Sequence, residues 1–314
     1  MYAISCLGIP QHGQIAHLSL TTYDWNNAVH ENALFVPFFH HLQILKIHIH
    51  SGGRAVPNVL PFCRELRELS LISVDIPPLV QDVDLPLVRT LQKLSLTQST
   101  LAWMDGLVFT QLQRFDVYNP GSPETFKQNV GMPACTHVVF EQYEREGLPI
   151  LQSNFHLPLL DAFELPSLWL RDEERVISAL QWIHAKKFKF GIFDTPPRFL
   201  EFLESKDEVE QLDLVIFSYS AETAQDILNS MSATNHITMK VPCPNMKVLG
   251  LQFHDIRGAK NREQVSQSCR QMMNERRSAG HFLEKCYIWW HHEDRKKAAA
   301  FVLVMENEVV TESS

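Results

Sequence analysis

Apolar residues recur in one short pattern along most of the chain. The pattern reads Leu-x-x-Leu-x-Leu in its clearest copies, which occupy residues 66–71 and, 25 residues later, residues 91–96. Side chains alternate between the two faces of a β-strand, so the last two leucines of each copy share one face and the residue between them points to the other. One such strand buries little apolar surface by itself. The pattern therefore predicts short strands that stack side by side and bury their leucines together.

The pattern recurs through the chain at a regular interval. When its copies are aligned on the second apolar residue, the eleven anchor residues are Leu18, Leu45, Leu69, Leu94, Phe115, Val138, Phe163, Phe188, Leu212, Leu249 and Cys286. The first eight spacings lie between 21 and 27 residues, and the last two are 37 residues. A period of about 20–29 residues is typical of leucine-rich repeats, in which every repeat adds one strand to a parallel sheet. The two longer repeats fit this architecture if each contains a longer helix.

The segments between the strands differ between the two halves of the chain. In the second half, apolar residues at helical spacing predict helices that begin after Asp172, Thr195 and Ser220. A last helix is predicted over residues 262–279, with Gly280 in the position of a C-terminal cap. In the first half, the connectors are short and rich in proline, and they predict turns.

The turns after the strands lack one feature of the commonest leucine-rich repeat. That consensus places an asparagine or a cysteine after the strand. The corresponding positions here are Val74, Ser99, Leu168 and His254. Because these residues cannot form a regular side-chain ladder, we expect each turn to satisfy its backbone groups in its own way and the curvature to be uneven.

Together these patterns predict an α/β fold over residues 1–314. We expect a single leucine-rich-repeat solenoid, with a curved parallel sheet of about eleven short strands and with helices and turns on its convex side. Residues 282–314 are expected to close the C-terminal end as a capping repeat, with a last strand within residues 301–310. Length alone would favour about two domains, but stacked repeats can extend one core without limit.

Composition narrows the classes of partner and the compartment. The net charge of −8 and the pI near 6.0 are unfavourable for binding to nucleic acid or to an anionic membrane surface, so we expect neither. The six cysteines contain no C-x-x-C pair, which is typical of a reduced intracellular protein. The sequence shows no signal peptide and no apolar run of membrane-spanning length. We therefore expect a cytoplasmic or nuclear protein.

The sequence contains none of the common catalytic motifs. We find no G-x-S-x-G, no G-x-x-x-x-G-K-[ST], no H-E-x-x-H and no G-x-G-x-x-G, so we expect neither an enzyme nor a bound cofactor. His48 and His50 would share one face of a strand, as half of a metal site would require. No further ligands accompany them at suitable spacing, so we expect no metal. A cysteine and a histidine that meet only in space stay open as an alternative.

The residues between and beside the anchors are the candidates for partner binding. In a solenoid of this kind they point to the concave surface of the sheet. The candidates are Lys46, Arg67, Lys93, Arg114, Asp116, Glu164, Lys187, Lys189, Asp213 and Tyr287. Their mixed charges favour a protein partner over a polyanion, whereas the alternative is a solvated strand face without a ligand. If they face solvent, Asp116→Lys and Glu164→Lys should leave the protein folded.

Trp289 and Trp290 come directly after the last of the eleven anchored strands. Exposed tryptophans would indicate a binding spot. The alternative, which we favour, is that the two rings close the end of the apolar core, as the terminal repeat of a solenoid must do.

Three segments resemble the leucine-rich-repeat region of fungal F-box proteins. Residues 63–71 (CRELRELSL) and 243–249 (CPNMKVL) are similar to the C-P-N-L-x-x-L-x-L start of strands in that family. Residues 276–286 (RRSAGHFLEKC) resemble its closing repeat. The resemblance implies a substrate receptor of a cullin-based ubiquitin ligase, with a protein substrate on the concave face.

In that family a helical F-box with a Leu-Pro-x-Glu-like opening binds the cullin adaptor. We recognise no such segment in the sequence, so we expect the adaptor as a partner only if an F-box is encoded upstream. The alternative is a free-standing leucine-rich-repeat scaffold with no role in ubiquitin ligation. An enzyme with an unrecognised site is a third hypothesis.

Overall fold

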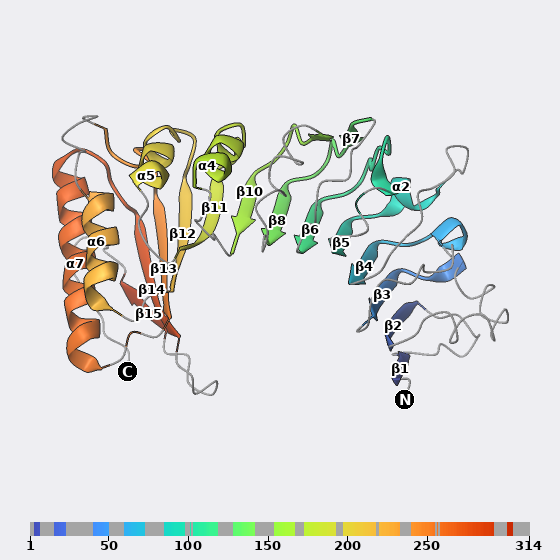
Figure 1. Cartoon of the computed structure of the whole chain (residues 1–314), viewed down its shortest axis with the longest axis horizontal. Coiled ribbons are helices and arrows are strands. Elements are labelled where there is room, and N and C mark those ends of the chain that lie inside the picture. The colour runs from blue at the N-terminus through green and yellow to red at the C-terminus, as the bar shows by residue number, and fades with distance from the viewer. Residues whose placement is uncertain are drawn as a thin grey trace. The chain divides into compact units, whose positions relative to one another are not determined.

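A computed structural model gives the arrangement of the chain (Figure 1). It describes residues 3–6, 16–22, 40–49, 60–72, 85–97, 101, 103–118, 128–141, 154–166, 173–192, 197–217, 220–232, 240–254, 256, 258–291 and 300–303. The chain divides into two compact units, Met1–Leu160 and Asp161–Ser314, and each is described by itself.

The described residues of the first unit form a seven-stranded sheet with little helix. Its strands in spatial order are β1 (Ala3–Cys6), β2 (His17–Thr22), β3 (Ile44–Ile49), β4 (Glu68–Ile72), β5 (Lys93–Thr97), β6 (Arg114–Tyr118) and β8 (His137–Glu141). All neighbours are parallel except β1 and β2. The remaining described elements are the short helices η2 (Leu60–Phe62) and α2 (Leu87–Thr90) and the two-residue strands β7 (Val130–Gly131) and β9 (Phe155–His156).

The second unit is a six-stranded sheet with four described helices. Its strands are β10 (Ala162–Leu165), β11 (Lys187–Ile192), β12 (Gln211–Phe217), β13 (Val248–His254), β14 (Lys285–His291) and β15 (Ala300–Leu303), and only β15 runs antiparallel to its neighbour. The helices are α4 (Glu173–Gln181), α5 (Pro197–Glu204), α6 (Ala221–Ser232) and α7 (Ala259–Ser278). They lie on one face of the sheet (Figure 1).

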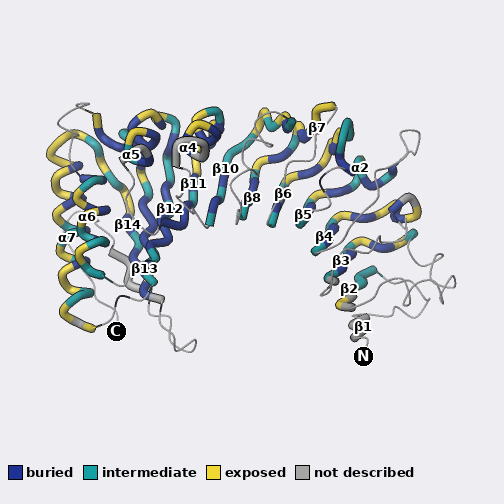
Figure 2. Tube along the Cα trace, viewed as in Figure 1, coloured by how far each residue is buried: buried dark blue, intermediate teal, exposed yellow. Residues whose placement is uncertain are grey.

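The predicted anchor residues are neighbours in the sheets. In the first unit Leu18, Leu45, Leu69, Leu94, Phe115 and Val138 pair in register from β2 to β8. In the second unit Phe163, Phe188, Leu212, Leu249 and Cys286 do the same from β10 to β14. The prediction of an α/β fold with parallel strands is thereby confirmed. The alternation of buried and less buried positions along the strands is visible in Figure 2.

The helices also agree closely with the sequence patterns. The predicted starts after Asp172 and Ser220 agree with α4 and α6, and α5 begins two residues after Thr195. Helix α7 begins three residues before the predicted residue 262, and the φ angle of +87° at Gly280 provides the left-handed residue that commonly ends a helix. The described part of the final strand, β15, begins one residue before the predicted range. Residues 304–310 lie outside the described residues.

Nine of the described parallel strands begin with the same pair of backbone hydrogen bonds. The Gln43 carbonyl accepts hydrogen bonds from the N–H groups of Arg67 and Glu68, at 2.8 and 3.0 Å. The Lys186 carbonyl does the same for Glu210 and Gln211. The acceptors in the two units are Ala16, Gln43, Arg67, Gln92, Gln113, Asp161, Lys186, Glu210 and Lys247. The backbone hydrogen bonds at these strand starts are therefore the same from repeat to repeat. Of the four positions after the strands, only His254 is among the described residues.

Aromatic side chains join helix α5 to the sheet. Phe188 and Phe190 on β11 point to the face that α5 covers, where they contact Phe199 and Phe202. The ring centroids lie 5.3–6.0 Å apart in edge-to-face geometry, which is favourable between aromatic rings. All four rings are fully buried. Burial of a side chain of this size contributes roughly 2–3 kcal/mol, so this cluster is a main source of stability for the middle of the second unit.

Two buried cations satisfy carbonyl groups near the ends of preceding helices. The Lys206 ammonium donates hydrogen bonds to the carbonyls of Gln181 and Ile183, at 3.1 and 2.6 Å. Carbonyls at a helix C-terminus lack partners within the helix and attract positive charge. Burial lowers the pKa of Lys206, and the neighbouring Glu208 carboxylate, 3.5 Å away, opposes that shift.

Arg276 makes the corresponding contact from helix α7. Its Nη1 donates to the carbonyls of Met231 and Pro242, and its Nη2 donates to that of Cys243, all at 2.9–3.0 Å. The side chain is completely buried, and burial lowers its pKa to about 10, which leaves it charged at neutral pH. One guanidinium therefore ties α7 to the last turn of α6 and to the segment that leads into β13.

We expect Arg276→Met to destabilise the second unit by about 3–5 kcal/mol, because three buried carbonyls lose their donor. Urea unfolding monitored by circular dichroism measures this loss. Arg277→Met is the matched control, since Arg277 is exposed and only stacks over the Phe282 ring; it should cost less than about 0.5 kcal/mol. Equal unfolding midpoints for the two variants would contradict the assigned role of Arg276.

Candidate partner-binding surface

The face of the second sheet opposite helices α4–α7 carries the residues between the anchors. No described helix lies on this face, which we call the open face (Figure 1). Its central row runs across β10–β14 in register and consists of Glu164, Lys189, Asp213, Gly250 and Tyr287. Four of these five positions carry polar or aromatic side chains, so the central row is chemically unlike the leucine-rich inner face.

The charges at the β10 and β11 end of the open face neutralise one another. Lys189 lies 3.5 Å from the Glu164 carboxylate, and Lys187 donates a 2.9 Å hydrogen bond to Asp161. Three of the predicted binding residues, Glu164, Lys187 and Lys189, are therefore already engaged within the chain. Exposed pairs of this kind contribute little stability, but they leave a partner few unmatched charges there.

A second set of exposed ion pairs lies at the strand starts. Glu210 lies between Lys247, at 3.0 Å, and Lys186, at 3.6 Å. The hydrogen bond from Lys247 lowers the pKa of Glu210, and the same hydrogen bond raises the pKa of Lys247. The backbone carbonyls of Lys186, Glu210 and Lys247 also accept the hydrogen bonds of the next strand. The ion pairs therefore join neighbouring repeats at their strand starts.

Asp213 differs from the other carboxylates of this surface. Its Oδ2 accepts a 2.9 Å hydrogen bond from the Gln211 amide, and no described cation lies within ion-pair distance of it. Partial burial raises the pKa of Asp213; the Gln211 hydrogen bond and the charge of Lys189 lower it by less, and Glu164 adds to the rise. The ionised carboxylate is thus incompletely solvated and incompletely paired.

Gly250 allows the Asp213 carboxylate to approach the aromatic residues of β14. A Cβ atom placed on Gly250 would overlap Asp213 Oδ1 and would lie 3.0 Å from the ring of Trp289. Neighbouring strands are about 4.8 Å apart, so side chains on β12 and β14 meet over β13 only where β13 has none. Glycine within a strand commonly marks such a close approach.

Aromatic rings complete this end of the open face. Tyr287 stacks on Trp289 with ring centroids 5.6 Å apart and planes 22° apart, and Trp289 is 38% exposed. Phe217 and His254, register partners on β12 and β13, stack at 4.7 Å. Trp290 points to the other face, where it is buried beneath Arg262 of α7. The adjacent tryptophans thus have different roles: Trp290 closes the core, and Trp289 is available on the surface.

In the first unit, three predicted binding residues form one cluster. Arg114 donates a 2.8 Å hydrogen bond to Asp116, Ser95 donates another at 3.1 Å, and the Lys93 ammonium lies 3.9 Å away. Asp116 is only 1% exposed, whereas the two cationic side chains are 40–42% exposed. Asp116 therefore orients Arg114 and Lys93 and is itself inaccessible to a partner. The expectation that Asp116 faces solvent is corrected by this burial.

The two remaining candidates, Lys46 and Arg67, are also in the first unit. Lys46 is exposed on β3, and Arg67 is exposed directly before β4, where its carbonyl accepts the paired hydrogen bonds of the next strand. The structure thus brings Lys93, Arg114 and Asp116 together in one unit and Glu164, Lys187, Lys189, Asp213 and Tyr287 on one face of the other. Gln211, Gly250 and Trp289 lie on the same surface but are not among the binding residues predicted from the sequence; the glycine within a strand was the available signal for their close approach.

Metal-binding and thiol chemistry find little support within the described residues. No group of three or more His, Cys, Asp or Glu side chains there is arranged to hold a metal ion. His48 is described, but His50 lies outside the described residues. Burial raises the pKa of Cys63, Cys243 and Cys286 to about 12, so these thiols stay protonated at neutral pH and are poor nucleophiles.

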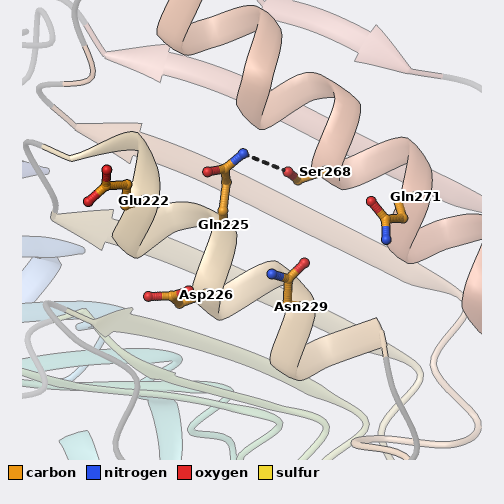
Figure 3. Close-up of a pocket in the computed structure, with 6 residues that line it drawn as sticks. All are labelled: Glu222, Gln225, Asp226, Asn229, Ser268 and Gln271. Carbon is orange, nitrogen blue, oxygen red and sulfur yellow. Dashed lines mark hydrogen bonds between the residues drawn. The ribbon is translucent and has the colours of Figure 1, made fainter.

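A polar groove lies between α6 and α7, on the helical side of the second unit (Figure 3). It has a volume of about 490 Å³ and is lined by Glu222, Gln225, Asp226, Asn229, Ser268 and Gln271. The only hydrogen bond drawn among these side chains joins Gln225 to Ser268 at 3.2 Å. Ligand pockets are usually concave and largely apolar, so this open polar groove is the weaker candidate.

No protein-family model, curated protein or solved structure matches the chain. In the described part of the chain, no helix combines the length and the apolar character that crossing a membrane requires.

We expect Asp213→Asn to stabilise the protein at neutral pH. Because folding raises the pKa of Asp213, the stability associated with its protonated form is present below the unfolded-state pKa and is lost as pH rises through the folded-state pKa. The variant should therefore melt about 1–2 °C higher than the wild type at pH 7, and this difference should shrink as pH falls towards about 4. Glu164→Gln, which removes an ion pair instead, should not raise the melting temperature. A lower melting temperature for Asp213→Asn at pH 7 would contradict this account.

Asp116→Lys should destabilise the first unit by about 3–5 kcal/mol, because it removes the buried acceptor of Arg114 and places a third cation beside Lys93. Glu164→Lys, on the open face, should cost no more than about 1 kcal/mol. Urea unfolding of both variants tests the difference. Similar losses of unfolding free energy in the two variants would mean that Asp116 is not the buried centre of its cluster.

Proposed function

We propose that the chain binds a protein partner through the open face of the second unit. The observation that carries the proposal is a partly exposed Tyr287–Trp289 stack beside the Asp213 carboxylate, which has no described cation within ion-pair distance, on a strand face that no described helix covers. Tyrosine and tryptophan are enriched at the centres of protein interfaces. Gln211 and Gln252 add hydrogen-bonding groups around them, as a polar rim would require.

The more specific proposal comes from the resemblance to fungal F-box proteins. It is that the chain is a leucine-rich-repeat module and forms the substrate-recognition part of an F-box-type ubiquitin ligase receptor. Its support is the equivalence of the repeats: the apolar positions of the two similar segments, Cys63 and Leu66 before β4 and Cys243 and Met246 before β13, are all buried. The mechanism would be positioning alone, in which the open face holds a substrate near a ligase assembled elsewhere. A free-standing repeat scaffold is the alternative.

The test is affinity purification of the chromosomally tagged protein from its native cells, with partners quantified by mass spectrometry. Tyr287→Ala/Trp289→Ala removes the aromatic stack, and Glu222→Lys/Asp226→Lys alters the groove of Figure 3 as the matched control. We expect a substrate partner to fall at least about tenfold with the first variant, as for loss of an interface hot spot, and to persist with the control.

Recovery of the cullin adaptor with the wild type and with both variants would support the ligase receptor. Recovery of the same substrate partner without the adaptor would favour the free-standing scaffold. If every co-purifying protein persists with Tyr287→Ala/Trp289→Ala, or falls only with the groove variant, the open face is not the binding surface.

A further inference from the structure

One carboxylate on the open face of the second unit has no described cation within ion-pair distance. The described side chains of the strands in this unit include two carboxylates, Glu164 and Asp213. Lys189 neutralises Glu164 at 3.5 Å. Among the described residues, the hydrogen-bond donor to Asp213 is a neutral amide, that of Gln211. Lys189 is the register partner of Asp213 and partly offsets its charge from a distance, but it makes its ion pair with Glu164. A partly buried carboxylate without a direct cationic partner is costly for a folded protein, and such groups tend to occur at functional sites.

The surroundings of Asp213 are aromatic rather than polar on the β14 side. Its Oδ1 and the Trp289 ring converge on the space above Gly250, where any larger residue would clash with the carboxylate. Tyr287, in register with Gly250, stacks on Trp289 and extends the aromatic surface. The Asp213 carboxylate and the Trp289 ring therefore lie close together, and carboxylates and aromatic ring faces both attract a cation.

Among biological cations, the arginine side chain matches this arrangement best. Its planar guanidinium can stack on an indole or phenol ring while its N–H groups donate to a carboxylate at the ring edge. The guanidinium is also more weakly hydrated than an ammonium group, so it loses less hydration free energy when it enters a partly desolvated site. An ammonium group would satisfy the charge of Asp213 but would gain less from the flat aromatic surface.

We propose that Asp213, Tyr287 and Trp289 form a subsite for an arginine side chain of the protein partner, with Gly250 providing the space in which Asp213 and Trp289 approach each other and Tyr287 extending the aromatic surface. The proposal rests on the proposed function and specifies the chemistry of the residue that is recognised. The guanidinium supplies a direct cationic partner, which no described residue provides for Asp213. A partner that presents a carboxylate or phosphate at this position is disfavoured by the same charge.

The subsite can be tested without knowledge of the partner. The probes are the peptides acetyl-Gly-Arg-Gly-amide, its lysine counterpart, and its citrulline counterpart, which has nearly the same shape without the charge. Binding is monitored by fluorine NMR of protein labelled with fluorotryptophan, with the Trp289 signal identified by its absence from Trp289→Phe. We expect the arginine peptide to shift that signal at about 1–50 mM, the affinity range of a single contact, and the other two peptides to bind at least about threefold more weakly.

Three variants test whether the Asp213 carboxylate itself, and not an effect on the fold, is responsible for arginine binding. Asp213→Asn should weaken arginine binding at least about fivefold, a factor that corresponds to about 1 kcal/mol. Gly250→Ala should weaken it as well, since the added methyl group displaces the Asp213 carboxylate. Glu164→Gln, on the same face, should leave the titration unchanged. Fluorine spectra of each variant without peptide report whether it is folded.

Three results would overturn the proposal: no shift with the arginine peptide, equal shifts with arginine and citrulline, or undiminished binding to Asp213→Asn. Equal binding of arginine and lysine would overturn the assignment of a planar cation. The partner purification distinguishes this failure from that of the proposed function. A partner lost with Tyr287→Ala/Trp289→Ala but retained with Asp213→Asn would leave the open face as the binding surface and remove arginine as its ligand.

Discussion

The fold depends on one backbone interaction, the carbonyl at each strand start that accepts two consecutive N–H groups from the next repeat. It uses no side chain, which explains how the repeats stack in register without the asparagine ladder of the commonest leucine-rich repeat. The acceptor residues range from Ala16 to Glu210 and Lys247. Because the side chains at these positions are not needed for stacking, they can carry charge, and in the second unit they form exposed ion pairs along the stack.

The regular part of the structure was predictable because it depends on period and alternation alone. Within each unit the anchors pair in register, and the four described helices of the second unit begin within a few residues of their predicted starts. The features that could not be predicted depend on contacts between residues far apart in sequence. Lys206 and Arg276 look like ordinary surface cations in the sequence, yet both are buried against carbonyls of preceding segments, 23–45 residues away.

The candidate surface was likewise predictable in its pattern but not in its contacts. Alternation placed Asp116, Glu164, Lys189 and Asp213 on the face opposite the leucines. It could not show which of these charges are already satisfied. Asp116 is buried under Arg114, and Glu164 is matched by Lys189, whereas Asp213 is left with a neutral donor. The chemical distinction between these carboxylates arises from neighbouring strands, and one glycine on β13 determines the groups that Asp213 can reach.

The guanidinium of Arg276 has a consequence for how the second unit opens. Terminal repeats of a stacked protein have one neighbour only and commonly fray, exchanging their amide hydrogens first. Here α7 cannot separate from α6 without exposing three buried carbonyls and a buried charge together. Strand β14 packs under the same helix through Trp290 and Arg262. The last repeats should therefore open as one cooperative unit, and the aromatic side chains on the outer face of β14 are held as rigidly as those in the middle of the sheet.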